Sequence, residues 1–96
     1  MVTEIALLNI KQGSTEAFEN AFAIAQNIIP PMKGYISHQL QKCLKDDHKY
    51  LLIVEWETVE DHEQGFRKSE AYKKWKNLLH HFYDPFPVVE HYKKIY

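Results

Sequence analysis

Four stretches of the chain carry the apolar, β-branched and aromatic composition that is typical of strands. Residues 2–10 form an apolar run that is bounded by turn residues and is too short for a typical helix. Residues 35–44 and 49–57 flank a short polar turn at 45–48, which is the pattern of a hairpin. Residues 88–96 follow a turn that contains two prolines. We therefore expect four strands at these positions.

Between the first two strands, apolar residues recur at helical spacing. A serine or glycine at 13–14 can cap this helix, and the two prolines at 30–31 end it, because proline disfavours a helical residue before it and cannot donate a hydrogen bond. The apolar positions that share one face of the helix are Phe18, Ala21, Phe22, Ala25 and Ile29.

A second helical region follows the third strand. Thr58 is expected to cap its start, with Asp61 three residues further on. A break is expected near Lys68 and Ser69, and Ser69 starts a second helical segment. The apolar face of that segment consists of Tyr72, Trp75, Leu78, Leu79 and Phe82.

The predicted order is strand, helix, strand, strand, helix, strand. This order is that of an α+β, ferredoxin-like βαββαβ fold, with a four-stranded antiparallel sheet and both helices on one face. The length of 96 residues fits one domain that covers residues 1–96, without a linker or a repeat.

The strands are apolar on both of their faces. In the third strand Leu52 and Val54 point to one side while Leu51 and Ile53 point to the other. The helices of one chain can cover only one side of a sheet, and a large exposed apolar patch usually marks an interface. We therefore expect a homodimer in which two sheets pack face to face.

Charge and composition narrow the partners further. The formal net charge is −1 and no basic stripe is present, so nucleic acid is not an expected partner. No run approaches the roughly 20 apolar residues of a membrane span. The start of the chain lacks the features of a signal peptide, and Cys43 is the single cysteine, so a cytoplasmic protein without a disulfide is expected.

The strand order, the apolar sheet and the segment VEWETVEDHEQGFRKSEAYKKWKNLL together resemble the antibiotic biosynthesis monooxygenase superfamily of dimeric α/β barrels. The resemblance spans nearly the whole chain, and its motifs specify the fold better than the chemistry. It implies a cofactor-independent monooxygenase acting on a small aromatic or quinol-type substrate, with no cofactor and no metal. A dimeric small-molecule-binding or stress-response protein and an isomerase of phosphorylated sugars are the alternatives in the same superfamily. Haem degradation is disfavoured, because Lys76 stands where that branch has an iron-ligating histidine one turn after an aromatic residue.

Oxygenation without a cofactor requires a general base that deprotonates the substrate, and histidine is the usual choice near neutral pH. Among the six histidines, His81 is our first candidate because it borders the apolar face of its helix, and His38 and His62 are the alternatives. His81 could equally cap the helix end, His62 could lie on the surface, and His38 could be a buried structural residue.

We expect the substrate pocket to lie between the sheet and residues 66–82. Its expected substrate-binding residues are Phe66, Arg67, Tyr72 and Trp75. Each has a structural alternative: aromatic residues at this spacing often belong to the core, and Arg67 could pair with a surface glutamate.

Overall fold

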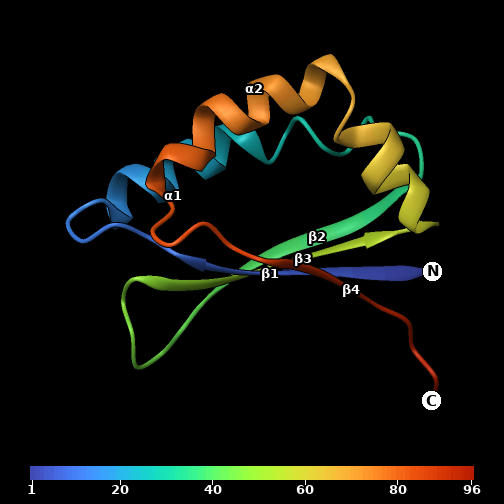
Figure 1. Cartoon of the computed structure of the whole chain (residues 1–96). Helices are drawn as coiled ribbons and strands as arrows, with labels where there is room; N and C mark the ends of the chain where they lie inside the picture. The colour runs from blue at the N-terminus through green and yellow to red at the C-terminus, as the bar shows by residue number, and fades with distance from the viewer.

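The computed structural model describes all residues from 1 to 96, and it has the predicted element order. Four strands form one antiparallel sheet in the order β2-β3-β1-β4, and the helices cover one of its faces (Figure 1). No helix is long and apolar enough to cross a membrane. The elements are β1 (Val2–Asn9), α1 (Thr15–Ala25), β2 (Tyr35–Lys42), β3 (Lys49–Trp56), the π-helix η1 (Asp61–Phe66), α2 (Glu70–Leu79), the 3₁₀ turn η2 (His80–Phe82) and β4 (Val89–Tyr92).

The hydrophobic core lies between the sheet and the helices. It joins the inward residues of β1 and β3 to the apolar face of α1 and to residues from η1 and α2. Its members are Ala6, Leu8, Ile10, Phe18, Phe22, Ala25, Ile29, Tyr50, Leu52, Val54, Trp56, Phe66, Trp75, Leu79 and Tyr83. The predicted alternation in β1 and β3 is therefore confirmed.

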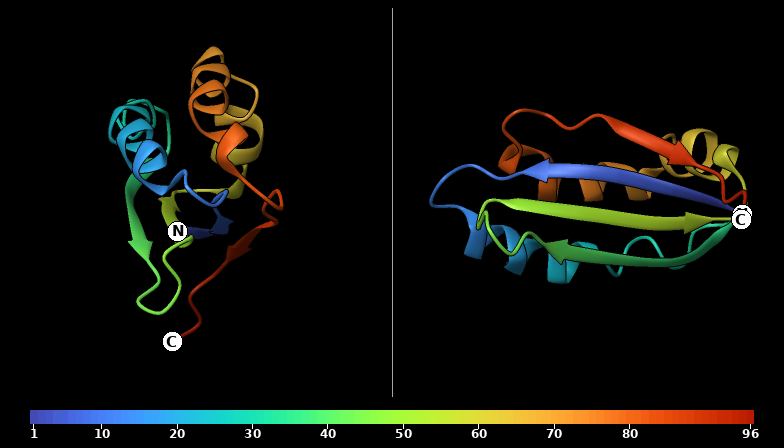
Figure 2. Two further views of the ribbon diagram at one scale, coloured as in Figure 1. Left: turned by 90° about the vertical axis from the view of Figure 1, so that its left-hand side faces the viewer. Right: turned by 90° about the horizontal axis from the view of Figure 1, so that it is seen from below.

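The opposite face of the sheet has no cover within the chain, as the view from below shows (Figure 2). Leu7 is 46% exposed there, and Ile5, Leu51 and Ile53 are half-buried. Both faces of the central strands are thus apolar, but only one is packed.

Several elements end earlier than predicted, and β2 contains a bulge. Helix α1 ends at Ala25, before the prolines, because the next amides bond three residues back, as Ile28 N–H does to Ala25 O at 2.9 Å. Strand β4 ends at Tyr92 because only four of its residues pair with β1. In β2 a bulge between Tyr35 and Ser37 resets the alternation, so Ile36 does not share the inward face of His38 and is 44% exposed.

The start and the break of the second helical region are confirmed. Asp61 N–H donates to Thr58 Oγ1 at 3.1 Å, and Thr58 Oγ1 donates in turn to Asp61 Oδ2 at 2.9 Å. Ser69 caps α2 by accepting from Tyr72 N–H at 3.2 Å. The first part is a π-helix, in which Arg67 N–H bonds back to His62 O at 3.0 Å.

Gly34 connects the start of β2 to this capped turn, and we expect it to tolerate no side chain. Its φ is +83°, and a Cβ at this position would collide with the side chain of Asp61. Gly13 has a similar φ of +81° but open space around it. Gly34→Ala should therefore lower the free energy of unfolding by about 3 kcal/mol and Gly13→Ala by about 1 kcal/mol. Urea denaturation of both variants checks this, and equal losses would contradict the role of the Asp61 contact.

Candidate active site

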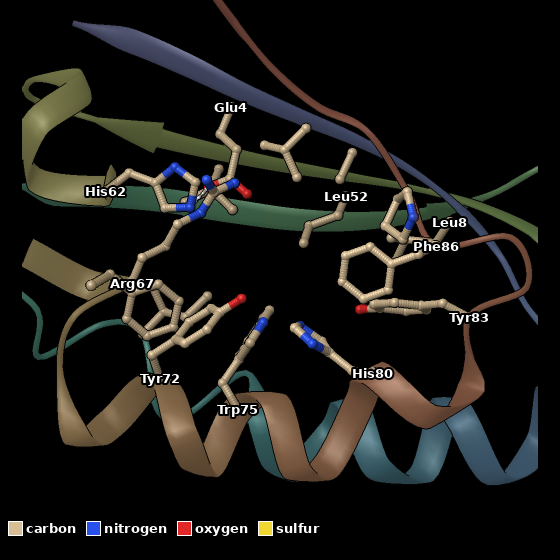
Figure 3. Close-up of a pocket in the computed structure, with 16 residues that line it drawn as sticks. Glu4, Leu8, Leu52, His62, Arg67, Tyr72, Trp75, His80, Tyr83 and Phe86 are labelled. Carbon is tan, nitrogen blue, oxygen red and sulfur yellow. Dashed lines mark ion pairs between the residues drawn. The ribbon is translucent and has the colours of Figure 1, made fainter. Parts of the chain in front are cut away.

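A cavity of about 370 Å³ lies between the helix-facing side of the sheet and α2 (Figure 3). Eleven of its 16 lining residues are hydrophobic, and the polar groups are few. The lining consists of Glu4, Ala6, Leu8, Ile29, Leu52, Val54, His62, Phe66, Arg67, Tyr72, Trp75, His80, Tyr83, Phe86, Pro87 and Val89. An apolar pocket with a few convergent polar groups is the usual form of a small-molecule site.

The capped turn between η1 and α2 shapes the wall opposite the sheet. Ser69 Oγ donates to Phe66 O at 2.6 Å, which fixes the end of η1 against the start of α2. The Phe66 ring then meets Tyr72 edge-on at 5.3 Å and Trp75 at 5.8 Å between ring centroids. These packed aromatic rings form a rigid, flat-sided wall.

The four residues that we expected to bind the substrate, Phe66, Arg67, Tyr72 and Trp75, all line this cavity. The Tyr72 hydroxyl points into it, and the side chain of Arg67, an exposed residue, extends toward Glu4 (Figure 3). Trp75 also packs edge-on against Phe22 of α1 at 5.8 Å, so it serves the core as well. Their binding of a substrate stays a prediction.

The two adjacent histidines lie in different surroundings from those expected. His81 is exposed, rests against Phe82 and does not line the cavity, so its expected position facing the sheet is wrong. His80 lines the cavity in its place. The physical reason is that α2 ends at Leu79 and continues as a 3₁₀ turn, which changes the angle between successive side chains.

His80 sits among aromatic rings. It meets Tyr72 at 5.8 Å and Phe86 at 4.9 Å, both edge-on, and no protein hydrogen bond occupies its ring nitrogens. Burial, followed by the nearby charge of Lys76, lowers the pKa of His80 below its ordinary value. The imidazole is therefore neutral near pH 7 and can accept a proton.

A chain of buried polar groups closes the other end of the cavity. Glu4 is 6% exposed and His62 is 3% exposed. Trp56 Nε1 donates to Glu4 Oε1 at 2.9 Å, and His62 Nε2 lies 3.4 Å from the same oxygen. On its other side, His62 Nδ1 lies 2.8 Å from His91 Nε2 of β4. The Trp56 and His62 rings also stack, with centroids 5.4 Å apart.

Burial has the largest effect on the pKa values of both Glu4 and His62. It raises the pKa of Glu4, while the Trp56 hydrogen bond and the Arg67 charge act in the opposite direction. It lowers the pKa of His62 to about 3, with further lowering by the charges of Arg67 and His91. His62 is thus a neutral imidazole at pH 7.

Sequence reasoning missed Glu4 as a site residue. The available signal was its register, because Glu4 shares the inward face of β1 with Ala6 and Leu8. A lone acid at such a position has to find a donor inside the fold.

His38, one of the two alternative bases, lies away from this cavity. It lines a separate groove between α1 and β2. Its Nδ1 lies 2.6 Å from the Tyr35 hydroxyl and its Nε2 lies 3.1 Å from Gln26 Oε1, so both ring nitrogens are engaged. No group of three His, Cys, Asp or Glu side chains is arranged to hold a metal ion.

The buried His62 should make stability depend on pH. An unfolded His62 takes up a proton near pH 6.5, whereas the folded one stays neutral down to about pH 3. The unfolded chain therefore binds more protons between these values, and the free energy of unfolding falls as the pH falls. From about pH 7 to about pH 5 this contribution amounts to about 2 kcal/mol.

Urea denaturation of the wild type and His62→Gln across this pH range measures the effect. The variant should lose the His62 contribution and show a flatter profile. Glu4, whose pKa is raised, acts in the opposite direction in both proteins, so the difference between them isolates His62. Parallel profiles would show that His62 ionises normally in the folded chain.

Comparison with known proteins places this chain in a family. The family model of the antibiotic biosynthesis monooxygenases matches residues 1–78. The uncharacterised protein YczJ of Bacillus subtilis is 58% identical over 95 residues, which cover 99% of this chain and 100% of that protein.

Solved structures agree with the family match. A candidate antibiotic biosynthesis monooxygenase from Bordetella bronchiseptica is 28% identical, with a TM-score of 0.93 over 99% of this chain and 97% of that one. SnoaB, a cofactor-independent oxygenase from Streptomyces nogalater, shares the fold with a TM-score of 0.78 at 18% identity, over 99% of this chain and 93% of its own. The chain therefore belongs to the antibiotic biosynthesis monooxygenase family.

Proposed function

We propose that the protein is a cofactor-independent monooxygenase that oxidises a small aromatic substrate of the quinol or anthrone type. The observation that supports this most is the neutral His80 imidazole, unengaged by protein hydrogen bonds, in an aromatic cavity of about 370 Å³. A flat, electron-rich ring fits between the aromatic wall and the sheet. Family membership and the fold shared with SnoaB point to the same chemistry.

The proposed reaction begins with proton abstraction. His80 takes the acidic proton of the substrate, and the resulting anion gives an electron to dioxygen. The two radicals combine to a peroxide on carbon. Loss of the remaining hydrogen on that carbon, with cleavage of the O–O bond, gives a carbonyl and water. The substrate supplies all four electrons, so no external reductant is required.

The other cavity residues have supporting roles in this proposal. The Arg67 guanidinium stabilises the negative charge that develops on the substrate oxygen. Phe66, Tyr72 and Trp75 hold the ring and exclude water. An isomerase of phosphorylated sugars has less support, because Arg67 is the single Lys or Arg side chain in the cavity lining.

Adjacent histidines allow a direct test of the base. His80→Ala should lower turnover of an anthrone or hydroquinone by roughly 100-fold or more, because it removes the proton acceptor. His81→Ala, an identical change one residue further on and outside the cavity, should leave turnover nearly unchanged. Oxygen consumption by metal-free and flavin-free protein measures both.

The reverse ranking of the two variants would restore His81 as the base and reject His80. Absence of oxygen consumption by the wild type across a panel of quinols, with quinol binding retained, would instead support a dimeric small-molecule-binding protein.

We also propose that the protein is a homodimer formed through the open face of the sheet. The support is the uncovered apolar surface of Ile5, Leu7, Leu51 and Ile53, which has no partner within the chain. A second copy offers the same surface, and two such sheets can close on each other about a twofold axis.

Substitutions at two neighbouring residues of β3 test the assembly and the folding of the protein separately. Ile53→Asp places a charge on the open face and should convert the dimer to a folded monomer, because the buried charge would have no partner in the interface. Val54→Asp places it in the core, where Val54 is 1% exposed, and should unfold the chain. Light scattering and circular dichroism distinguish these outcomes, and a wild-type monomer at micromolar concentration would contradict the dimer.

A further inference from the structure

The polar chain at the end of the cavity reaches from β4 to the cavity wall. His91 is half-buried on the edge strand β4, His62 is buried behind it, and Glu4 lines the cavity. Consecutive groups are 2.8 Å and 3.4 Å apart. The register explains the alignment, since Glu4 and His91 are paired residues on β1 and β4 and the His62 ring lies against both.

The contacts assign a direction to this chain. Once Glu4 has given up its proton, the carboxylate can only accept, so the hydrogen between it and His62 then belongs to His62 Nε2. Neutral His62 then has a bare Nδ1, which accepts from His91 Nε2–H. In the series His91–His62–Glu4, each N–H group therefore points away from β4 and toward the Glu4 carboxylate in the cavity.

If His62 and His91 served only to stabilise the buried Glu4 carboxyl, two imidazoles in series would not be required. Trp56 Nε1 already donates a hydrogen bond of 2.9 Å to Glu4. Two imidazoles in series can accept a proton at one nitrogen and release one at the other, which an amide or hydroxyl of fixed orientation cannot do as readily. Proton transfer between His62 and Glu4 requires the 3.4 Å separation to shorten by a few tenths of an ångström, to hydrogen-bond length.

We propose that Glu4 is the proton donor to the oxygen that leaves during O–O cleavage, and that His91 and His62 return a proton to it from solvent. This inference rests on the proposed oxygenase function. It assigns the cavity two proton-handling groups at opposite ends, with His80 as base and Glu4 as acid.

The protonated His80 first returns the substrate proton to the peroxide, which becomes a hydroperoxide and leaves His80 neutral. His80 then takes the remaining hydrogen of the peroxide-bearing carbon as a proton, and the C–H electrons form the carbonyl as the O–O bond breaks. The departing oxygen takes the proton of the Glu4 carboxyl and leaves as water. His80 then releases its proton to solvent while Glu4 receives one through His62, so no net proton is consumed.

The ionisation of the inner groups is compatible with these roles. Burial raises the pKa of Glu4, which favours the protonated acid. Burial lowers the pKa of His62, which keeps it neutral and able to pass a proton on. The charged and titratable groups around the carboxyl are His62, His91, Arg67, Tyr72 and Tyr83.

Variants of the outermost residue test the relay. His91→Gln keeps a hydrogen-bond donor beside His62 but cannot transfer a proton, and it should lower kcat about tenfold or more with little change in KM. His91→Ala should show a similar loss that added imidazole restores. The matched control is His48→Gln, because His48 lies in the turn between β2 and β3 and away from the cavity lining, and kcat should not change.

A second measurement does not depend on turnover. Long-range ¹H–¹⁵N NMR spectra report which ring nitrogen carries the hydrogen, and above the pH at which Glu4 loses its proton both His62 and His91 should carry it on Nε2. A hydrogen on His62 Nδ1 would overturn the proposed direction of the chain.

Turnover by the wild type that is unchanged in His91→Gln and insensitive to imidazole in His91→Ala would overturn the relay and leave the oxygenase standing. If the wild type shows no turnover but His62 and His91 carry the expected tautomers, the proposed oxygenase function and the donor role of Glu4 would both be overturned. The proposed direction of the hydrogen bonds from His91 through His62 to Glu4 would stand.

Discussion

The buried indole of Trp56 is the contact on which the cavity depends. This residue ends β3 and is 0% exposed, and the single N–H group of its indole ring donates to Glu4 on the neighbouring strand. A carboxyl at a core position costs several kcal/mol unless donors surround it. Trp56 meets that requirement while its ring stacks on His62. One side chain thus secures the polar end of the cavity and positions the η1 segment above it.

The two faces of the sheet have different surroundings. On the helix side, large apolar side chains form the core, and the cavity remains where α2 and the β1–β3 surface do not meet. On the other side the same strands carry apolar residues with no function in the site. The proposed chemistry of the cavity and the proposed assembly of two chains can therefore change independently, since successive residues of one strand lie on different faces of the sheet.

The order of elements and the inward faces of β1 and β3 could be predicted because they follow from local periodicity and from turn residues. The capped turn at Ser69 could be predicted for the same reason, and with it the residues Phe66, Tyr72 and Trp75 of the cavity wall. The choice between His80 and His81 could not, because it depends on where α2 changes to a 3₁₀ turn. The Glu4–His62–His91 alignment joins three distant parts of the sequence, and only the strand register brings them together. The bulge in β2 likewise could not be predicted, because the order of apolar and polar residues in this part of the sequence does not reveal its position.

Strand β4 is the least secured part of the sheet, since it lies at the edge and pairs with β1 over only four residues. Proteins open first where few hydrogen bonds and few buried contacts must be broken. Detachment of β4 would separate His91 from His62 and remove Val89 from the cavity wall, while Trp56 and the core below stay in place. The amide hydrogens of this strand should thus exchange with solvent long before those of β1 and β3. Local unfolding of this one short strand would therefore open the cavity on the side of β4.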